Sequence, residues 1–535
     1  MRHIKLLAPL ALAAGLTVTA CKDLLVEDPK GFTTTDTFFK TGADLNSATI
    51  AMYNALRGLQ GQAQWTTPEL ASDQTRADNR EPNAGTYGAD RLIWDASTGQ
   101  TGGYWTSMYP TITRANLVLA NGPGIATADL VTKTYNLAEA KFMRGFAYFV
   151  LTRAYDDVPL LLSPEEQANS SPTRTPVEQV HQAAIKDLTE AEADLPATWP
   201  SLDGYQIPTV GRVTKGASQM ALADLYLWRS SFMKKNEWQK ASDWAKKVID
   251  SGVWRLNDNY LSTFLPSNKG NREMILALAN SGVTTNNRSL FQLFYYPRDW
   301  GLDQGQGGGW GLIHPTDWFL NSYLPGDFRG SQGYNGYKSD SGFVAGGCGL
   351  TLCADTLGDG PMPWKYRKTD GGDTWWLGDV DVPLYRYAEA ILMYAEAENE
   401  LNNAAVAVQY LNMIRARARK GTGAQTRTEP HDYGTAGELM DKASVREAIY
   451  MERAWEFAFE AKRWFDLVRR DSEDPTYWAT QLSLHDPNSE RLGPTSGQTY
   501  KKRWPIPQTQ ITANPGLCQN PGYGGTPCPA GVGWP

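Results

Sequence analysis

The sequence has few of the residues from which catalytic and metal sites are usually built. Its five histidines stand apart, at positions 3, 181, 314, 431 and 485, and none lies at the spacing of a metal-binding pair such as His-Glu-x-x-His. It contains no Gly-x-Ser-x-Gly motif, and the glycine-rich run 305–311 lacks the lysine and helix start of a phosphate-binding loop. The sequence therefore predicts no catalytic residues, no metal and no cofactor, and we expect a protein that is not an enzyme.

Basic clusters and long apolar stretches are also scarce. The formal net charge is −7, and this mild acidity argues against binding to nucleic acid. Arg2 and Lys5 precede an apolar run over residues 6–18, which is typical of a secretory signal and too short to span a membrane. The run leads through small residues to Cys21, the pattern of bacterial lipoproteins. We expect a lipid on Cys21 as the only membrane anchor; the alternative is an ordinary signal peptide followed by a chance cysteine.

The chain has only five cysteines, and four remain if Cys21 is acylated. They form two local pairs, Cys348 with Cys353 and Cys518 with Cys528. Because an exported chain meets an oxidising compartment, the sequence predicts two disulfides. Four free thiols are the alternative. A zinc site built from all four is the least favoured option, because the second pair is too widely spaced for zinc ligands.

Helical patterns cover most of the chain. Between residues 136 and 155, Phe142, Phe146 and Phe149 recur at the spacing of one helix face, and we expect this helix to end near Tyr155. Further helical patterns occupy residues 38–59, 104–120, 176–195, 213–252, 386–420 and 436–470, the last as one long closing helix. Helical pairs of about 34 residues are typical of tetratricopeptide repeats. The sequence predicts a mainly α protein with a tetratricopeptide-like scaffold.

Residues 260–383 break this helical rhythm. The stretch is rich in glycine, tyrosine and tryptophan, and a long insertion without regular structure is uncommon in a compact domain unless it is functional. We interpret it as a large, irregular, loop-rich insertion that faces the ligand. The predicted division is a signal peptide (1–20), a lipidated tether (21–35), an N-terminal helical part with repeat-like hairpins (36–259), the insertion (260–383) and a C-terminal part with a helical hairpin, a long helix and a Pro/Gly-rich tail (384–535).

Aromatic rings in such loops predict a sugar-binding site. A pyranose presents a flat C–H face that stacks on a ring, and its hydroxyls need polar partners such as Asp, Asn and Arg. The stacking candidates are Trp94, Tyr295, Tyr296, Trp300, Trp310 and Trp375, and the hydroxyl-binding candidates are Asp73, Arg76 and Arg80. Each ring could instead pack in the core.

Three carboxylates in the predicted closing helix, Glu452, Glu456 and Glu460, lie four residues apart with Arg453 and Arg463 nearby. Paired carboxylates can hydrolyse glycosides from facing walls of a cleft. Three on one helix beside arginines more often form a structural ion-pair network, and we expect that role here.

Four stretches resemble the SusD/RagB family of outer-membrane nutrient-binding lipoproteins. They are the E-A-K-F-x-R helix from Glu139, which runs into Asp157-Val158-Pro159-Leu160-Leu161, and the stretches RYAEAILMYAEAENEL from Arg386, IYMERAWEFAFEAKRWFDLVRR from Ile449 and RWPIPQTQITANPGLCQNPGY from Arg503.

This resemblance implies a SusD-like fold and a function in nutrient uptake. A member of this family is anchored by its lipid in the cell outer membrane and exposed at the cell surface. It binds a nutrient, most often an oligosaccharide, without hydrolysing it, and delivers it to a TonB-dependent outer-membrane transporter of the SusC type. The alternatives are a secreted glycoside hydrolase, a repeat scaffold for protein assembly, or peptide capture.

Overall fold

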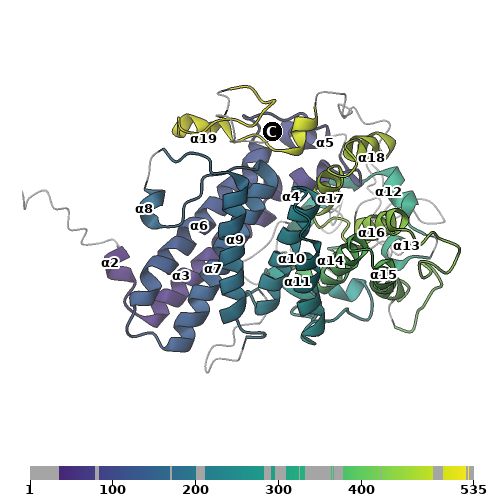
Figure 1. Ribbon diagram of the computed structural model, residues 1–535, viewed down its shortest axis with the longest axis horizontal. Helices are drawn as coiled ribbons and strands as arrows, with labels where there is room; N and C mark the ends of the chain where they lie inside the picture. Colours follow the sequence, from purple (N-terminus) through teal and green to yellow (C-terminus); the bar gives the residue numbers. More distant parts are fainter. Residues whose placement is uncertain are drawn as a thin grey trace, which may run out of the picture.

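The computed structural model describes residues 35–78, 83–168, 171–199, 211–281, 291–295, 309–324, 326–331, 363, 365–366, 378–421, 423–485, 498–525 and 528. This part of the chain is mainly helical (Figure 1), as predicted. None of its helices has the length and apolar character needed to cross a membrane. The helices are α2 (Thr35–Phe38), α3 (Gly42–Leu56), α4 (Gln62–Leu70), α5 (Ala84–Asp90), α6 (Gly103–Asn121), α7 (Leu130–Tyr155), α8 (Pro164–Gln167), α9 (Val177–Asp194), α10 (Lys215–Ser231), α11 (Trp238–Asp250), α12 (Asp317–Ser322), α13 (Phe328–Ser331), α14 (Tyr387–Glu400), α15 (Ala404–Ala418), α16 (Lys442–Glu456), α17 (Arg463–Arg470), α18 (Tyr477–His485) and α19 (Gln508–Ala513).

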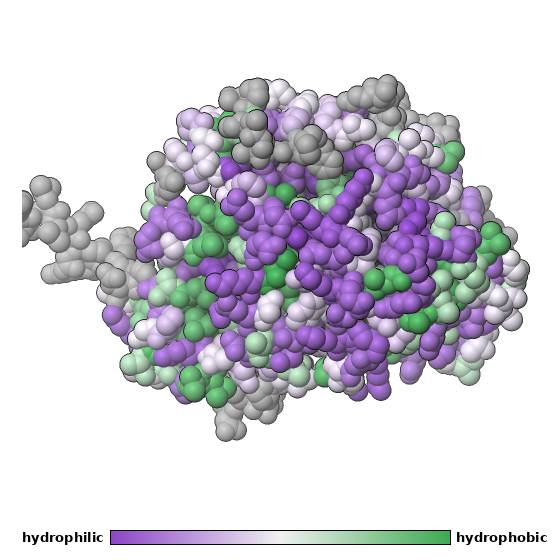
Figure 2. All heavy atoms as spheres, in the orientation of Figure 1, coloured by the Kyte–Doolittle hydropathy of each residue, from purple (hydrophilic) through white to green (hydrophobic). Residues whose placement is uncertain are grey.

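The longer helices pack side by side in a row. The row runs from α3 through α6, α7, α9, α10, α11 and α14 to α15 and α16, and Figure 1 shows it from left to right. The pairs α10–α11 and α14–α15 occupy the stretches where the sequence predicts helical hairpins; their repeat character stays a prediction. Figure 2 shows hydrophilic side chains over the middle of this face, where α9, α10 and α11 lie, and apolar side chains gathered mainly to its left and right.

Helix α7 is the centre of the N-terminal half. The Asp129 carboxylate caps its first turn by accepting from Thr132 N (2.8 Å), and the helix ends at Tyr155 as predicted, where Asp156 takes a positive φ of 68°. A side chain at Gly145 would lie 3.0 Å from a backbone oxygen of α9, so glycine permits the close approach of these two helices. Small residues therefore set the spacing of the row at this point.

The prediction of one continuous closing helix over residues 436–470 is wrong. It is divided into α16 and α17 by a turn in which Phe459 and Ala461 have positive φ values of 63° and 55°. The turn is held by side chains from distant segments: the Tyr366 and Tyr295 hydroxyls donate to Phe459 O at 2.7 and 3.2 Å. A backbone carbonyl that a continuous helix would have used internally, that of Phe459, is bonded by both hydroxyls instead.

Two short antiparallel ribbons join segments that are far apart in the sequence. In the first, β1 (Thr75–Ala77) pairs with β3 (Ile313–Pro315), so that Arg76 lies opposite His314. In the second, β2 (Met274–Leu278) pairs with β4 (Val382–Arg386). The chain that leaves the scaffold after β2 therefore returns beside it at β4.

One of the two predicted cysteine pairs falls in the described part of the chain. Cys518 and Cys528 form a disulfide with an Sγ–Sγ distance of 1.98 Å. Cys21, Cys348 and Cys353 lie outside the described residues, so the lipid attachment and the first pairing stay predictions.

Candidate functional site

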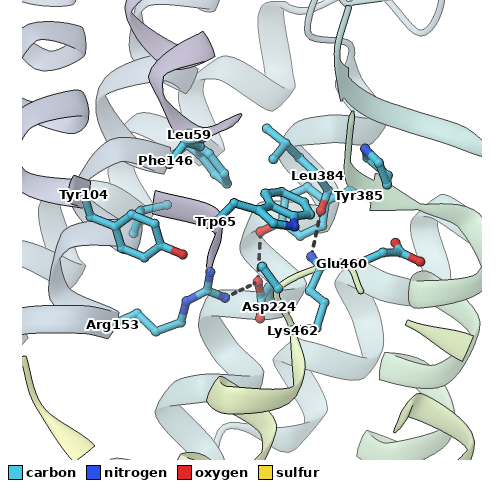
Figure 3. A pocket seen from close by; sticks show the side chains of 13 residues that line it. Leu59, Trp65, Tyr104, Phe146, Arg153, Asp224, Leu384, Tyr385, Glu460 and Lys462 are labelled. Carbon is cyan, nitrogen blue, oxygen red and sulfur yellow. Dashed lines mark hydrogen bonds and ion pairs between the residues drawn. The ribbon is translucent and has the colours of Figure 1, made fainter. Parts of the chain in front are cut away.

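A central pocket lies where α4, α7, α10, β4 and the turn between α16 and α17 meet (Figure 3). Its cavity volume is only about 50 Å³. Its polar side chains bond one another or the backbone: Asp224 accepts from Arg153 (3.3 Å) and from the Tyr385 hydroxyl (2.9 Å), and Lys462 donates to Leu384 O (2.7 Å). These charged and hydroxyl groups thus already have internal partners.

The aromatic walls of this central pocket offer no open ring face. Trp65, Tyr104 and Phe146 are each at most 5% exposed. A sugar ring needs a solvent-accessible aromatic face of about its own size on which to stack. The central pocket is therefore an internal seam between the two halves of the molecule, and we do not assign the glycan site to it.

The three glutamates of the sequence prediction, Glu452, Glu456 and Glu460, lie in a buried network of ion pairs. Their cationic partners are Arg329, Arg386, Arg415, Arg417 and Lys365, and Glu273 and Asp327 complete the network. Burial alone would raise the pKa of Glu456, but the neighbouring arginines outweigh it and lower that pKa to about 2. The glutamates have the structural role that the sequence predicts. The described part of the chain also gathers no group of three or more His, Cys, Asp or Glu side chains that could hold a metal ion.

Asp73, a predicted hydroxyl-binding residue, lies inside the protein. Arg463 donates to both of its carboxylate oxygens at 2.8 Å, and His485 Nδ1 lies 2.9 Å from one of them. Burial would raise the pKa of Asp73, but Arg463 and His485 lower it well below the ordinary range. The Trp318 ring stacks flat on the His485 ring, with the two ring centres 3.4 Å apart. The Asp73 carboxylate is thus engaged internally, and we leave it out of the proposed site.

Trp94 and Tyr295, two predicted stacking residues, also pack inside. Trp94 is 5% exposed and donates through Nε1 to the Tyr523 hydroxyl at 2.9 Å. Tyr295 is completely buried, and its hydroxyl accepts from Trp65 Nε1 at 2.6 Å. Both rings therefore tie the scaffold to its loops, and neither presents a face to a ligand.

Trp310 lies in a different setting, at the end of the β1–β3 ribbon. Here three rows of backbone run side by side: Asp78 N donates to Leu312 O (3.3 Å), Leu312 N donates to Phe294 O (2.9 Å), and Trp310 N donates to Leu293 O (2.8 Å). The half-buried Trp310 ring packs against Phe294, with ring centres 5.6 Å apart. Three separate segments that carry predicted site residues thus come together at one place.

We call Arg76, Trp310 and Trp318 the ribbon surface, because these half-buried side chains lie on or directly beside β1 and β3. Sequence reasoning missed Trp318. Its signal was a tryptophan in the first turn of a short helix capped by Thr316. Four predicted residues, Arg80, Tyr296, Trp300 and Trp375, lie outside the described residues.

Comparison with known proteins agrees with this architecture. The family described as "Starch-binding associating with outer membrane" matches residues 26–227, and the SusD family matches residues 351–523. The helical row and these two matches together define a SusD-like protein. The chain belongs to the SusD/RagB family.

Individual relatives extend over nearly the whole chain. SusD-like protein P25 of Formosa agariphila is 26% identical, over 94% of this chain and 95% of its own. The Starch-binding protein SusD of Bacteroides thetaiotaomicron is 25% identical, over 81% of this chain and 80% of its own. The solved structure of surface glycan-binding protein A from Bacteroides uniformis superposes with a TM-score of 0.72 at 21% identity, covering 90% of this chain and 99% of its own. The last match shows a shared fold.

Proposed function

We propose that this protein is a lipid-anchored binding protein of the bacterial cell surface that captures a glycan and passes it to a TonB-dependent outer-membrane transporter of the SusC type. Family membership supports this proposal, and so do relatives whose names describe starch or glycan binding. The observation that carries it furthest is the ribbon surface. Trp310, where three segments of the chain meet, and Trp318, beyond the other end of the ribbon, are both half-buried.

The ribbon surface has the chemistry that a sugar requires. Half-buried tryptophans are held rigidly by their packed edge, so their outward faces can stack on C–H surface with little loss of side-chain freedom. Arg76 is a half-buried residue of β1, and a guanidinium is a group that hydrogen-bonds to hydroxyls. The protein binds without breaking a bond in this proposal, because the carboxylates of the closing segment are already used in internal ion pairs.

Membrane attachment in this proposal rests on the Cys21 lipid. The family description includes association with the outer membrane. A lipid at the start of the chain, followed by the tether of residues 21–35, would hold the folded part close to the transporter. The binding protein would then present its ligand at the mouth of the transporter.

Replacing Trp310 with alanine tests the glycan site. We expect the free energy of binding to weaken by about 1–2 kcal/mol, since part of an aromatic face no longer covers apolar C–H surface. Calorimetric titration with a ligand found on a glycan array, beginning with maltoheptaose, measures this loss. The melting temperature should barely change, because a half-buried loop residue contributes little to the core.

Trp244 gives a matched control. It is also a half-buried tryptophan, but it lies on α11 of the scaffold, where Lys247 covers its ring at 3.6 Å. Trp244→Ala should leave glycan affinity unchanged. Unchanged affinity in Trp310→Ala, for a ligand that the natural protein binds, would remove Trp310 from the site.

A further inference from the structure

A histidine lies between two carboxylates in the segment that joins α15 to α16. His431 Nδ1 lies 2.7 Å from a carboxylate oxygen of Glu429, and His431 Nε2 contacts the carboxylate of Glu438. The backbone N–H of His431 also donates to Glu429, at 2.8 Å. The segment lies at the end of the molecule that carries α13, α15 and α16, on the right in Figure 1. One imidazole ring thus bridges two acidic side chains.

Only the doubly protonated form of the His431 ring satisfies both contacts. A neutral imidazole has one N–H group and one lone pair, so one of its nitrogens would face a carboxylate without a proton between them. An imidazolium donates from both nitrogens and carries a positive charge that both carboxylates attract. The geometry therefore couples this bridge to the protonation of His431.

The bridged carboxylate of Glu438 also organises the backbone beside it. One of its oxygens accepts from Gly434 N at 3.1 Å and from Ala436 N at 2.9 Å, which closes a turn over residues 434–438. The turn leads directly to Leu439, which is 68% exposed. His431 thus holds the side chain around which this turn is built.

Further charged groups lie around the bridge. Arg415 of α15 donates to Glu452 at 3.0 Å and to His431 O at 3.1 Å. Arg419, just after α15, donates to the Asp432 carboxylate at 2.8 Å. The neighbouring elements add Asp327 and Arg329, which pair with each other, Arg427, whose guanidinium lies over the Phe328 ring, and Asp441, which caps α16. Because Arg415 and Arg419 are each paired with another acid, Glu429 and Glu438 act most directly on the ring.

We propose that His431 is a pH-dependent clasp: its protonated ring ties Glu429 to Glu438 and fixes residues 429–438, and loss of its proton as the pH rises loosens the turn 434–438. This device is a property of the fold and goes beyond the proposed glycan binding. It makes the shape of the surface that carries Leu439 depend on pH.

The sign of the pH dependence follows from the charges. Hydrogen bonds to Glu429 and Glu438 raise the pKa of His431 above its ordinary value of 6.5. Burial would raise the pKa of Glu438, but hydrogen bonds from the backbone and from His431 lower it to about 2, so this carboxylate stays charged. The clasp is therefore fully closed below pH 6.5 and opens as the pH rises through the raised pKa of His431.

Hydrogen exchange of the full chain, read by mass spectrometry between about pH 5.5 and about pH 9, tests the clasp. The rates are corrected for the intrinsic pH dependence of amide exchange. We expect protection of residues 431–438 to fall about fivefold across this range, the scale of one partly exposed, charge-assisted hydrogen bond. Protection of α7, in the other half of the molecule, should stay constant.

Three variants locate the effect. His431→Gln cannot take up the proton, so residues 431–438 should keep one level of protection at every pH. Glu438→Gln keeps the shape of the side chain and removes one charge, which should shift the fall in protection to lower pH. His485→Gln is the matched control: His485 also lies beside a carboxylate, with Nδ1 2.9 Å from Asp73, but belongs to α18. It should leave the response of residues 431–438 unchanged.

NMR titration of the protein labelled at histidine gives the midpoint of His431 directly, with His431→Gln identifying its signal. A midpoint above 6.5 that coincides with the fall in protection supports the clasp. A midpoint at or below 6.5, constant protection in the natural protein, or an equal pH response in His431→Gln would overturn it. If His431→Gln does not fold, an unshifted response in Glu438→Gln overturns the clasp on its own.

Discussion

The interiors of the two halves of this protein are built from different kinds of residues. Around α7 the interior is mainly apolar: Phe142 and Phe146 stack with ring centres 5.6 Å apart, and Phe149 beside them is completely buried. Around the turn between α16 and α17 the interior is charged, with Arg386 and Glu456 both completely buried. Figure 1 shows α7 in the left half of the molecule and the α16–α17 region on the right.

This difference shows what each kind of interior contributes to stability and to the arrangement of the chain. Apolar packing stabilises in proportion to buried area and tolerates small shifts of geometry. A buried ion pair gains little net free energy, because attraction mainly offsets the cost of removing charges from water. It does penalise any arrangement that leaves one charge alone. The network therefore fixes which distant segments meet at the turn, while the apolar helices supply most of the stability.

Removing one cation from the network should have the largest effect on stability. Arg386 bonds Glu273, Glu456 and Glu460, with its Nη1 2.7 Å from Glu273. Arg386→Met leaves these carboxylates short of positive charge, and we expect a loss of about 5 kcal/mol in the free energy of unfolding. Urea denaturation measures it. A loss below that of an ordinary surface substitution would mean that the network relaxes and exchanges partners.

Removing a ring from the apolar side should cost somewhat less. Phe146 is buried, but it borders the central pocket, so part of the space left behind adjoins an existing opening. We expect Phe146→Ala to lower the free energy of unfolding by about 3 kcal/mol. Urea denaturation under the same conditions gives the comparison. If this variant lost more than Arg386→Met, the ranking of the two interiors would be reversed.

The charged interior should also make stability depend on pH, through a buried carboxyl group, Glu69. Glu69 lies beside the turn, and burial raises its pKa to about 8 even though Ala461 N–H and Lys365 favour the charged form. The folded state therefore keeps this proton while the unfolded state loses it at its ordinary pKa of 4.5. Glu69 therefore contributes to the free energy of unfolding in full below pH 4.5, and this contribution is lost as the pH rises from 4.5 through about 8.

We expect this group to lower stability by about 1.4 kcal/mol per pH unit between these limits. Glu69→Gln, which cannot titrate, should remove that slope while leaving the acid end unchanged. Unfolding curves at pH values between the two limits provide the measurement. Identical slopes for the variant and the natural protein would show that Glu69 titrates normally.

An exposed ion pair should have the smallest effect. Lys246 pairs with Asp250 one turn further along α11, and both side chains are exposed. Because water and salt screen such a pair, Lys246→Ala should change the free energy of unfolding by less than about 0.5 kcal/mol. A larger loss in the same denaturation experiment would indicate that position in the helix, and not burial, sets the strength of ion pairs here.

Much of the helical scaffold could be predicted from local patterns. The spacing of Phe142, Phe146 and Phe149 predicts a buried helix face, and Pro159 with the aspartates before it predicts where the helix ends; the structure agrees on both. These features depend on neighbours within a few positions, which the sequence displays directly. The ion-pair role of Glu456 was also predicted, but its cationic partners are the remote residues Arg329, Arg386 and Arg417. The neighbouring Arg453 and Arg463 pair with Asp466 and Asp73 instead.

The site could be predicted only in part. Trp94 and Trp310 look alike in the sequence, since both stand in glycine-rich loops, yet the first is buried and the second is half-buried. Asp73 looks like a sugar-binding loop residue, but its partner Arg463 lies 390 positions away. The residues around Asp73 in the sequence do not indicate such a remote partner.

The sequence by itself thus determined the helical periods, their main end points, the family and the aromatic character of the loops. Tertiary structure alone decided the break between α16 and α17, because that turn depends on tyrosine hydroxyls and buried charges contributed by remote segments. It also decided which rings face outward. Exposure is a property of the assembled surface, and the contacts that create it join residues hundreds of positions apart.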